Sequence, residues 1–246
     1  MGTGLCGTRL RGNIVCVNSS FSSCVRTSNA VIDHQHKNIS DTSVIRRTDV
    51  DVTSKITSVQ FSSCTFNEMT LSGEYVSSDG GAAIRVDEAH STLTVTQCFF
   101  HKCTTTKYRS DGGAICVWEY SLDYPVFLSL CSFTECENTG SMGTGGSVFC
   151  DSNSTVALTD CFLEESYSQD EAGALILNSH SLATLSNCAF VSCSSIWAAG
   201  ALGVFNVDSI DFSFLQFRDC SSTNRPETKD LYFGALNPLV ISLQLK

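Results

Sequence analysis

Apolar and polar residues alternate in short segments along most of this chain. After residue 58 one such segment returns six times: two apolar residues two positions apart, a small or apolar residue that is usually Cys, then Phe or Leu, and usually another Cys. A seventh copy runs from Ile14 to Cys24. The Phe or Leu position of the copies falls at Phe21, Phe66, Phe100, Phe133, Leu163, Phe190 and Phe217. Alternation with a period of two predicts strands with one buried face.

A second block, rich in glycine and alanine, precedes most copies and keeps step with them. It occurs at residues 81–86, 112–117, 145–150, 172–177 and 199–204. Its fourth and sixth residues are apolar, so it also predicts a strand with that face inward. The paired glycines fit a corner where φ is positive, or where two backbones pass closely. Asp79, Asp111 and Asp170 stand just before these corners, where Asp can bond to the turn backbone.

The spacing of the copies decides the fold class. The last three Phe or Leu positions, 163, 190 and 217, lie 27 residues apart, and such a period indicates stacked repeats. Short strands without helical periodicity predict an all-β fold, a parallel β-helix (solenoid) of about seven coils. Stacking at about 4.8 Å gives one continuous core. Residues 1–246 then form a single β-helix domain, with a polar insert at 25–58 between the first and second coils.

A leucine-rich repeat has coils of similar length and is the main alternative. Leu182, Leu185 and Cys188 fit its Leu-x-x-Leu-x-Leu pattern superficially. Around Cys98 and Cys131 the leucines fall elsewhere, and the glycine block has no place in that motif. The β-helix therefore accounts for more of the sequence.

The two blocks together carry a family resemblance. The Gly-Gly-Ala-Ile block followed by Cys-x-Phe-x-x-Cys resembles the repeats of right-handed parallel β-helix proteins of the pectin-lyase-like superfamily, and the resemblance therefore implies a right-handed parallel β-helix. It is similar in particular to repeats of bacterial polymorphic outer membrane proteins and of protist repeat proteins, with Cys in place of their closing Asn. The resemblance covers residues 10–245 apart from the insert, and its motifs are specific for the fold and weak for any activity. It implies a surface or secreted protein, either one used in adhesion or one of unknown role.

Charge and hydropathy narrow the function classes. The chain has 246 residues, with 15 Lys and Arg against 25 Asp and Glu, and a formal net charge of -10. An acidic chain without a basic patch is a poor nucleic-acid binder. No apolar run approaches the length of about 18 residues that spans a membrane. Residues 1–11 lack a signal-peptide pattern and residues 239–246 end without a polar cap, so we expect a fragment of a longer extracellular or cell-surface protein.

Most of the fourteen cysteines fall in two alignment columns. One column contains Ser19, Cys64, Cys98, Cys131, Cys161, Cys188 and Leu215, and the other contains Cys24, Met69, Cys103, Cys136, Ser166, Cys193 and Cys220. Columns that accept Leu, Met or Ser select a side chain that packs, as buried free cysteine does. Stacked cysteines would also lie within the Cα range of about 4.4 to 6.8 Å that disulfides allow. Packing, disulfides between coils and metal binding stay open here, although Cys pairs repeated along an axis do not close four ligands around a point.

Carboxylates are the main candidates for catalytic residues in this chain. A glycosidase needs two of them about 5 to 9.5 Å apart, and stacking could bring Glu135 and Glu165 together. The same column holds Lys102, Ser192 and Asp219, which is typical of solvated turns. A lyase needs a base beside acids that hold Ca²⁺, and the strands offer no such cluster. The Asn-Thr-Asp, Asp-Asp, Gly-His-Gly and Arg-Ile-Lys motifs of the superfamily's hydrolases are absent from the sequence.

The histidines offer one metal-like motif. His34 and His36 have a usable His-x-His spacing after Asp33, but they lie in the polar insert without a second ligand pair, as in an exposed loop. His90, His101 and His180 fall at loop or turn positions with no fixed partner. We therefore assign no catalytic, cofactor-binding or metal-binding residue.

Three Asn-x-Ser/Thr triplets, at Asn18, Asn38 and Asn153, would accept glycans in a eukaryotic secretory pathway. Asn18 is the weakest of them because it adjoins the Ser19 column. Two functions remain: a non-catalytic scaffold for adhesion or for binding glycans or proteins, and a polysaccharide lyase or glycoside hydrolase with an unidentified site. We expect the first, as a monomeric rod without a cofactor, a nucleic-acid partner or a membrane span.

Overall fold

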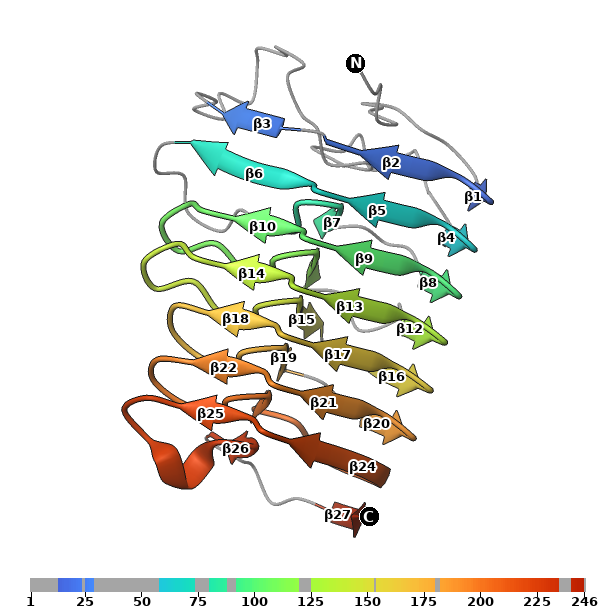
Figure 1. Cartoon of the computed structure of the whole chain (residues 1–246). Coiled ribbons are helices and arrows are strands. Elements are labelled where there is room, and N and C mark those ends of the chain that lie inside the picture. The colour runs from blue at the N-terminus through green and yellow to red at the C-terminus, as the bar shows by residue number, and fades with distance from the viewer. Residues whose placement is uncertain are drawn as a thin grey trace.

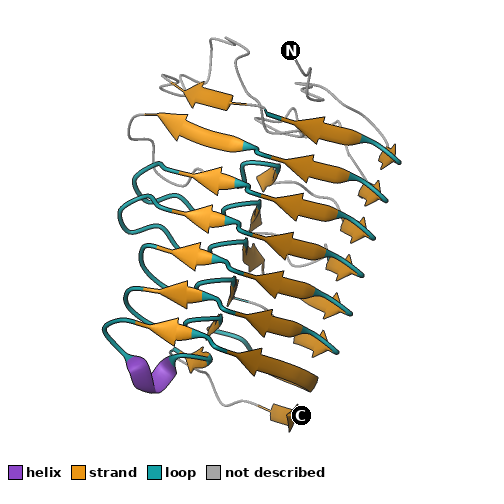
Figure 2. Ribbon diagram, viewed as in Figure 1, coloured by secondary structure: helices purple, strands orange, loops and turns teal. Residues whose placement is uncertain are grey.

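The chain folds into a parallel β-solenoid whose coils stack along one rod (Figure 1). This computed structural model describes residues 13–23, 25–28, 58–73, 80–87, 92–119, 125–152, 154–179, 182–234 and 240–245. Strands dominate these ranges, and their one helix is a single 3-10 turn, η1 (Pro226–Thr228) (Figure 2). The predicted all-β solenoid is therefore confirmed.

Each coil presents four faces, which belong to three parallel sheets. Face A contains β1 (Asn13–Val17), β4 (Ser58–Ser62), β8 (Thr92–Thr96), β12 (Val126–Ser129), β16 (Thr155–Thr159), β20 (Leu182–Ser186), the first part of β24 (Ser209–Arg218), and β27 (Val240–Leu245). Face B contains β2 (Ser20–Ser22), β5 (Thr65–Asn67), β9 (Phe99–His101), β13 (Ser132–Thr134), β17 (Phe162–Glu164), β21 (Ala189–Val191) and the end of β24. Because β24 continues around the corner, faces A and B form one 14-stranded sheet.

The other two faces are separate sheets. Face C, with seven short strands, contains β3 (Val25–Ser28), β6 (Thr70–Gly73), β10 (Thr104–Thr105), β14 (Glu137–Asn138), β18 (Tyr167–Ser168), β22 (Ser194–Ser195) and β25 (Ser221–Ser222). Face D, with six strands, contains β7 (Ile84–Asp87), β11 (Ile115–Glu119), β15 (Val148–Ser152), β19 (Leu175–Asn178), β23 (Leu202–Phe205) and β26 (Leu231–Phe233).

The coil count differs slightly from the expected seven. Five coils, from β4–β7 to β20–β23, have one separate strand on every face. The end coils differ: β1–β3 has no described face D strand, and β24–β26 merges two faces in one strand. The predicted insert at 25–58 begins in β3 and ends where β4 begins, and residues 29–57 lie outside the described residues.

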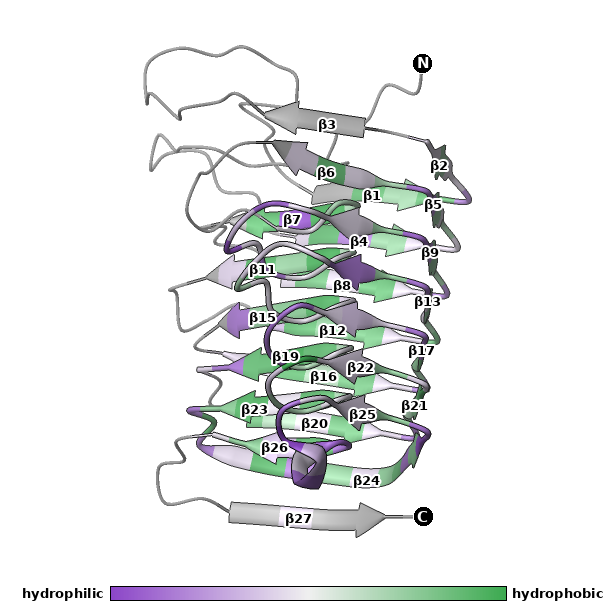
Figure 3. Cartoon of the chain, turned by 60° about the vertical axis from the view of Figure 1, so that its left-hand side comes forward, coloured by the Kyte–Doolittle hydropathy of each residue, from purple (hydrophilic) through white to green (hydrophobic). Residues whose placement is uncertain are grey.

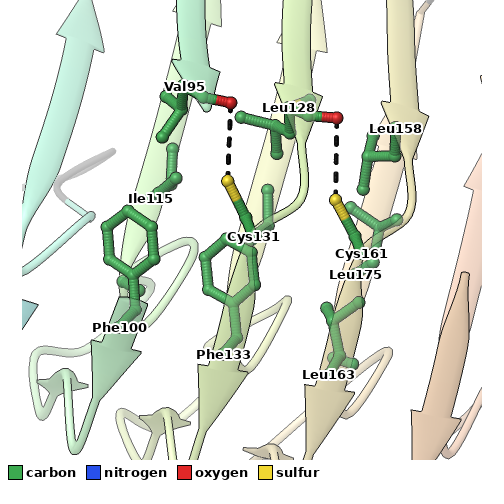
Figure 4. Packing of buried hydrophobic residues seen from close by; sticks show 14 of the residues in the cluster. Val95, Phe100, Ile115, Leu128, Cys131, Phe133, Leu158, Cys161, Leu163 and Leu175 are labelled. Atoms are coloured by element: carbon green, nitrogen blue, oxygen red, sulfur yellow. Dashed lines mark hydrogen bonds between the residues drawn. The ribbon is translucent and has the colours of Figure 1, made fainter. Parts of the chain in front are cut away.

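Equivalent residues of successive coils lie directly over one another. Phe66 pairs in register with Phe100, and Phe100 with Phe133. Their ring centroids are 4.7 and 4.6 Å apart and nearly parallel, and all three rings are buried. Figure 4 shows Phe100 and Phe133 on adjacent coils, and Figure 3 shows apolar residues recurring along the strands of successive coils. The stacked aromatic column predicted from the repeat is therefore confirmed.

Single residues in the left-handed region turn the chain at the corners between faces A, B and C. Leu130 and Glu135 are examples from one coil, with φ of 54° and 52°. The N–H of Leu130 donates to the Thr159 carbonyl of the next coil, so the turn remains bonded within the stack. The residue after each of these two corners, Cys131 or Cys136, is turned into the core.

The glycine blocks form the corner before face D, for both predicted reasons. Gly112 has a φ of +70°, and the equivalent Ala172 adopts 53°. The second position of each block contacts the following coil. At Gly146, which has this position in the block at 145–150, a Cβ would lie 1.9 Å from the Gly173 carbonyl oxygen. A Cβ cannot occupy that space, so the backbone contact requires glycine.

The twelve described cysteines are free and buried. Cys131 Sγ donates to the Val95 carbonyl at 3.4 Å, and Cys161 Sγ to the Leu128 carbonyl at 3.6 Å, in each case one coil back (Figure 4). Burial raises the pKa of the Cys98 thiol to about 11 and that of Cys150 to about 12. Protonated thiols that pack and donate weak hydrogen bonds match the packing interpretation of the columns. Cys6 and Cys24 lie outside the described residues.

Candidate functional site

The sequence candidates Glu135 and Glu165 lie on adjacent coils, after β13 and β17, and Glu165 is exposed. Glu135 is turned to the preceding coil, where its Oε1 lies 3.3 Å from His101 Nε2 and its Oε2 lies 3.5 Å from Lys102 Nζ. His101 Nδ1 lies 2.7 Å from Asn67 Oδ1 one coil further back. His101 therefore has fixed partners, contrary to the sequence expectation. With side chains about 40% exposed, this ladder joins three coils on the outside of face B and contributes little to stability.

Several other candidates lie outside the described residues, namely Asp33, His34, His36, Asn38, Asp79, His90, Asn153 and His180. Asn18 is described: it is exposed, with a φ of 49°, beside a half-buried Ser19 whose hydroxyl donates to the Val17 carbonyl at 3.1 Å. Adjoining the Ser19 column therefore does not bury Asn18. Within the described ranges, no three His, Cys, Asp or Glu side chains come together as metal ligands would.

Asp111 behaves differently from the predicted turn-capping residue. Its Oδ1 accepts a hydrogen bond of 2.6 Å from Thr144 Oγ1 on the next coil, so it links two corners. The pKa of Asp111 is raised to about 7, mainly by burial. The charge of Asp151 adds to this shift, whereas interactions with Thr144, Arg85 and Trp118 oppose it. A carboxyl group with a near-neutral pKa and several partners is a frequent feature of functional sites.

Beside Asp111, one register position on the outside of face D forms a continuous row. Trp118 of β11 pairs with Asp151 of β15, Asp151 with Asn178 of β19, and Asn178 with Phe205 of β23. All four side chains are partly exposed. We call Trp118, Asp151, Asn178 and Phe205 the face D row. It presents an aromatic ring, a carboxylate, an amide and a second aromatic ring on successive coils, about 4.8 Å apart.

Hydrogen bonds and packing hold the face D row in place. Asn178 Nδ2 donates to Asp151 Oδ2 at 3.1 Å, and Asn206 Nδ2 donates to Asn178 Oδ1 at 3.2 Å. Burial raises the pKa of Asp151, while hydrogen bonds from Asn178 and Ser179 oppose this shift. The two amides thus fix the side chains of Asp151 and Asn178 along the row.

An apolar layer outside the sheet supports the row. The layer consists of Cys116, Phe149, Ala172, Ile176 and Ala199, all buried although they lie outside the main core. Trp118 packs on it with its ring centroid 5.1 Å from that of Phe149. The left-handed corners at Ala172 and Ala199 contribute to this layer, so the same turn that starts face D also supports its outer surface.

The sequence repeat does not predict the row, because the repeat is defined by its inward positions. Its residues follow the glycine blocks directly: Trp118 comes after 112–117, Asp151 after 145–150, Asn178 after 172–177 and Phe205 after 199–204. Extending the alignment by one column would have found it. The mixed chemistry of that column gives no pattern of its own, because each position faces outward.

The chain matches no protein-family model, no curated protein and no solved structure. The fold and its repeats define it as a protein of the parallel β-solenoid class. No helix in the described part of the chain has the length and apolar character that crossing a membrane requires.

Proposed function

We propose that this protein is a non-catalytic β-solenoid scaffold, secreted or displayed on a cell surface, that binds an extended glycan along the face D row. The observation that carries the proposal is the register-aligned series Trp118, Asp151, Asn178 and Phe205. The row has one residue on each of four successive coils, so a polymer can contact it over several of its units.

The chemistry of the row suits sugars. Aromatic rings provide apolar faces on which the C–H face of a sugar ring can lie, while their edges stay in contact with water. Asp151 accepts hydrogen bonds and Asn178 both donates and accepts, which matches hydroxyl groups that do both. A few fixed polar groups among apolar side chains are typical of small-molecule sites.

Two further considerations support a scaffold. The sequence resembles pectin-lyase-like β-helix repeats and polymorphic outer membrane protein repeats, which implies adhesion at a surface. Glu135 and Glu165 are the carboxylates that stacking could bring together as a glycosidase pair. The carboxylate of Glu135 instead contacts His101 and Lys102.

One observation favours a second function, cleavage of a polysaccharide. Burial raises the pKa of Asp111 to about 7, and the charge of the nearby Asp151 contributes to this shift. A carboxyl group whose pKa lies near neutrality can donate a proton in catalysis. The alternative is thus a glycoside hydrolase or lyase with Asp111 as the proton donor.

Binding to a panel of neutral, acidic and amino polysaccharides tests the proposal. We expect Trp118→Ala and the near-isosteric Asp151→Asn each to weaken polysaccharide binding by about tenfold, which corresponds to about 1.4 kcal/mol of binding free energy. The control is Trp197→Ala, which removes an indole that is 54% exposed in the loop between faces C and D. Equal loss in all three variants, or no binding by the wild type, would reject the face D row as a glycan site.

A turnover assay separates the two functions. Product release from a bound polysaccharide, as new reducing ends or unsaturated ends, would establish the enzyme and remove the scaffold proposal. In that case Asp111→Asn should abolish turnover and leave binding, because Asn keeps an acceptor for Thr144 and loses the proton.

A further inference from the structure

Five buried thiols lie over one another at the corner between faces A and B. They belong to five successive coils, and each is at most 2% exposed: Cys64, Cys98, Cys131, Cys161 and Cys188. We call these five residues the thiol column. Figure 4 shows two of them, Cys131 and Cys161, on adjacent coils. Backbone hydrogen bonds keep the corner in register, as where the Phe162 N–H donates to the Cys131 carbonyl at 2.9 Å.

The thiols of neighbouring coils interact with one another. Cys161 interacts with both Cys131 and Cys188, and Cys98 interacts with Cys64. An electrostatic interaction joins Cys98 to Cys131. The thiol column is therefore continuous over its five coils.

The spacing of the column is too wide for disulfides and suits a bridging metal ion. Equivalent atoms of successive coils lie about 4.8 Å apart in a parallel sheet, whereas a disulfide needs Cβ atoms about 3.5 to 4.5 Å apart. A soft metal ion held in a line by two thiolates places the two sulfur atoms about 4.6 Å apart, given metal–sulfur bonds of about 2.3 Å. Neighbouring thiols can therefore take an ion between them without a movement of the backbone.

Backbone groups already face the sulfur atoms of the column. The N–H of Cys64 donates to Cys98 Sγ at 3.4 Å. The backbone of Cys98, Cys131 and Cys161 interacts likewise with the thiol on the next coil. Hydrogen bonds to sulfur favour the thiolate over the thiol, and proteins use them to stabilise metal–thiolate sites. They offset part of the cost of burying a negative sulfur atom.

We propose that adjacent thiols of this column bind soft monovalent metal ions, Cu(I) above all, with one ion held in a line between two sulfur atoms. Thiolate ligands select Cu(I). Two ligands suffice for a linear site, whereas structural zinc needs four, and the described ranges hold no group of three or more ligands. Each ion displaces two thiol protons to the solvent, so two thiolates and one positive ion leave a single negative charge, which the facing N–H groups stabilise.

Pairing sets how many ions the column holds. The bonds of a sulfur atom are bent, so one sulfur cannot bridge two ions along a straight line, and each thiol belongs to one pair. Five thiols therefore hold at most two ions. Without Cys161, one pair forms among Cys64, Cys98 and Cys131, Cys188 stays alone, and one ion is lost. Without Cys131, the pairs Cys64–Cys98 and Cys161–Cys188 remain, and no ion is lost.

This site goes beyond the sequence expectation, which assigned no metal ligand, and it is independent of the glycan proposal on face D. Cys16 does not extend the column, because it lies on face A in register with Phe61. At the corner position the coil before Cys64 has Ser19, and the coil after Cys188 has Leu215. The pairing is therefore confined to five thiols.

The number of ions held by two variants tests the pairing. The intact chain is refolded without oxygen in the presence of Ag(I), which has the same charge and linear geometry as Cu(I), washed with a small thiol, and weighed by native mass spectrometry. We expect Cys161→Ser to hold one ion fewer than the wild type, and the matched control Cys131→Ser to hold as many as the wild type. Both cysteines are 2% exposed, so the two substitutions are equally buried.

Any result in which Cys161→Ser does not hold fewer ions than Cys131→Ser overturns the proposal, including the absence of ions from all three proteins. Circular dichroism melting curves confirm that each variant is folded, and Cys161→Ala with Cys131→Ala makes the same comparison if a serine variant is not. X-ray absorption of the wild type loaded with Cu(I) then counts the ligands. We expect two sulfur atoms for each ion, and three or four would overturn the linear site.

Discussion

The hydroxyl oxygens of Ser147 and Ser166 lie 2.6 Å apart in the interior of the solenoid, and both side chains are fully buried. Ser147 stands where the four other glycine blocks have Ala, and Ser166 stands where its column otherwise has Cys or Met. The two departures from the repeat therefore meet each other. Each hydroxyl finds a partner that the regular repeat would not provide.

This relationship predicts strong coupling between the two positions. Ser147→Ala alone leaves the Ser166 hydroxyl buried with one partner fewer, and should lower the free energy of unfolding by about 1 to 3 kcal/mol. Ser147→Ala with Ser166→Cys restores the regular repeat and should lie within about 1 kcal/mol of the wild type. Urea unfolding of the four proteins in the cycle measures this. Additive losses would contradict the coupling.

The thiols should be free but protected. Titration of the denatured, unreduced protein should find at least the twelve described cysteines as thiols. The native protein should react slowly because all twelve are buried, and burial also raises the pKa of Cys98 and Cys150. Alkylation followed by mass spectrometry counts both. A denatured count near zero would replace the packing columns with disulfides.

Gly146→Ala should be among the most damaging single substitutions in the chain. Its Cβ would lie 1.9 Å from the Gly173 carbonyl oxygen, so two coils would have to separate. We expect the free energy of unfolding to fall by about 3 kcal/mol or more, because the added Cβ strains a close backbone contact. Gly203→Ala is the control, because its added Cβ would meet mainly the Phe205 side chain, which can move. Similar melting temperatures for the two variants would contradict this account.

Asp111 should make stability fall as pH rises from about 4 to 7. Its pKa is 3.8 when unperturbed and about 7 in the fold, so in this window the folded state binds more protons than the unfolded state. Asp111→Asn cannot ionise and should gain about 1 to 3 kcal/mol relative to the wild type at pH 8, but little at pH 4. Urea unfolding at both pH values checks this. A constant difference between the proteins would show that the Asp111 pKa is not raised.

Much of the fold followed from the sequence because inward residues share one requirement. Phe66, Phe100 and Phe133 must all be buried, and a shift of one residue in any coil would turn its ring outward. The repeat thus determined the strands, the buried face and the stacking register. The repeat does not predict the last face D strand, β26, because Lys229 and Asp230 stand where the other blocks have small residues. Only the apolar residues Leu231 and Phe233 match the block there.

The outer surface was decided by the tertiary structure. Glu135 and His101 are 34 residues apart, and Trp118 and Asp151 are 33 apart, yet each pair lies on adjacent coils. The sequence by itself determined that this protein is a stack of β-coils, because burial imposes the same pattern on every coil. Only the three-dimensional structure placed the face D row. Outward residues have no common burial requirement, and their neighbours depend on the loop lengths that set where each coil begins.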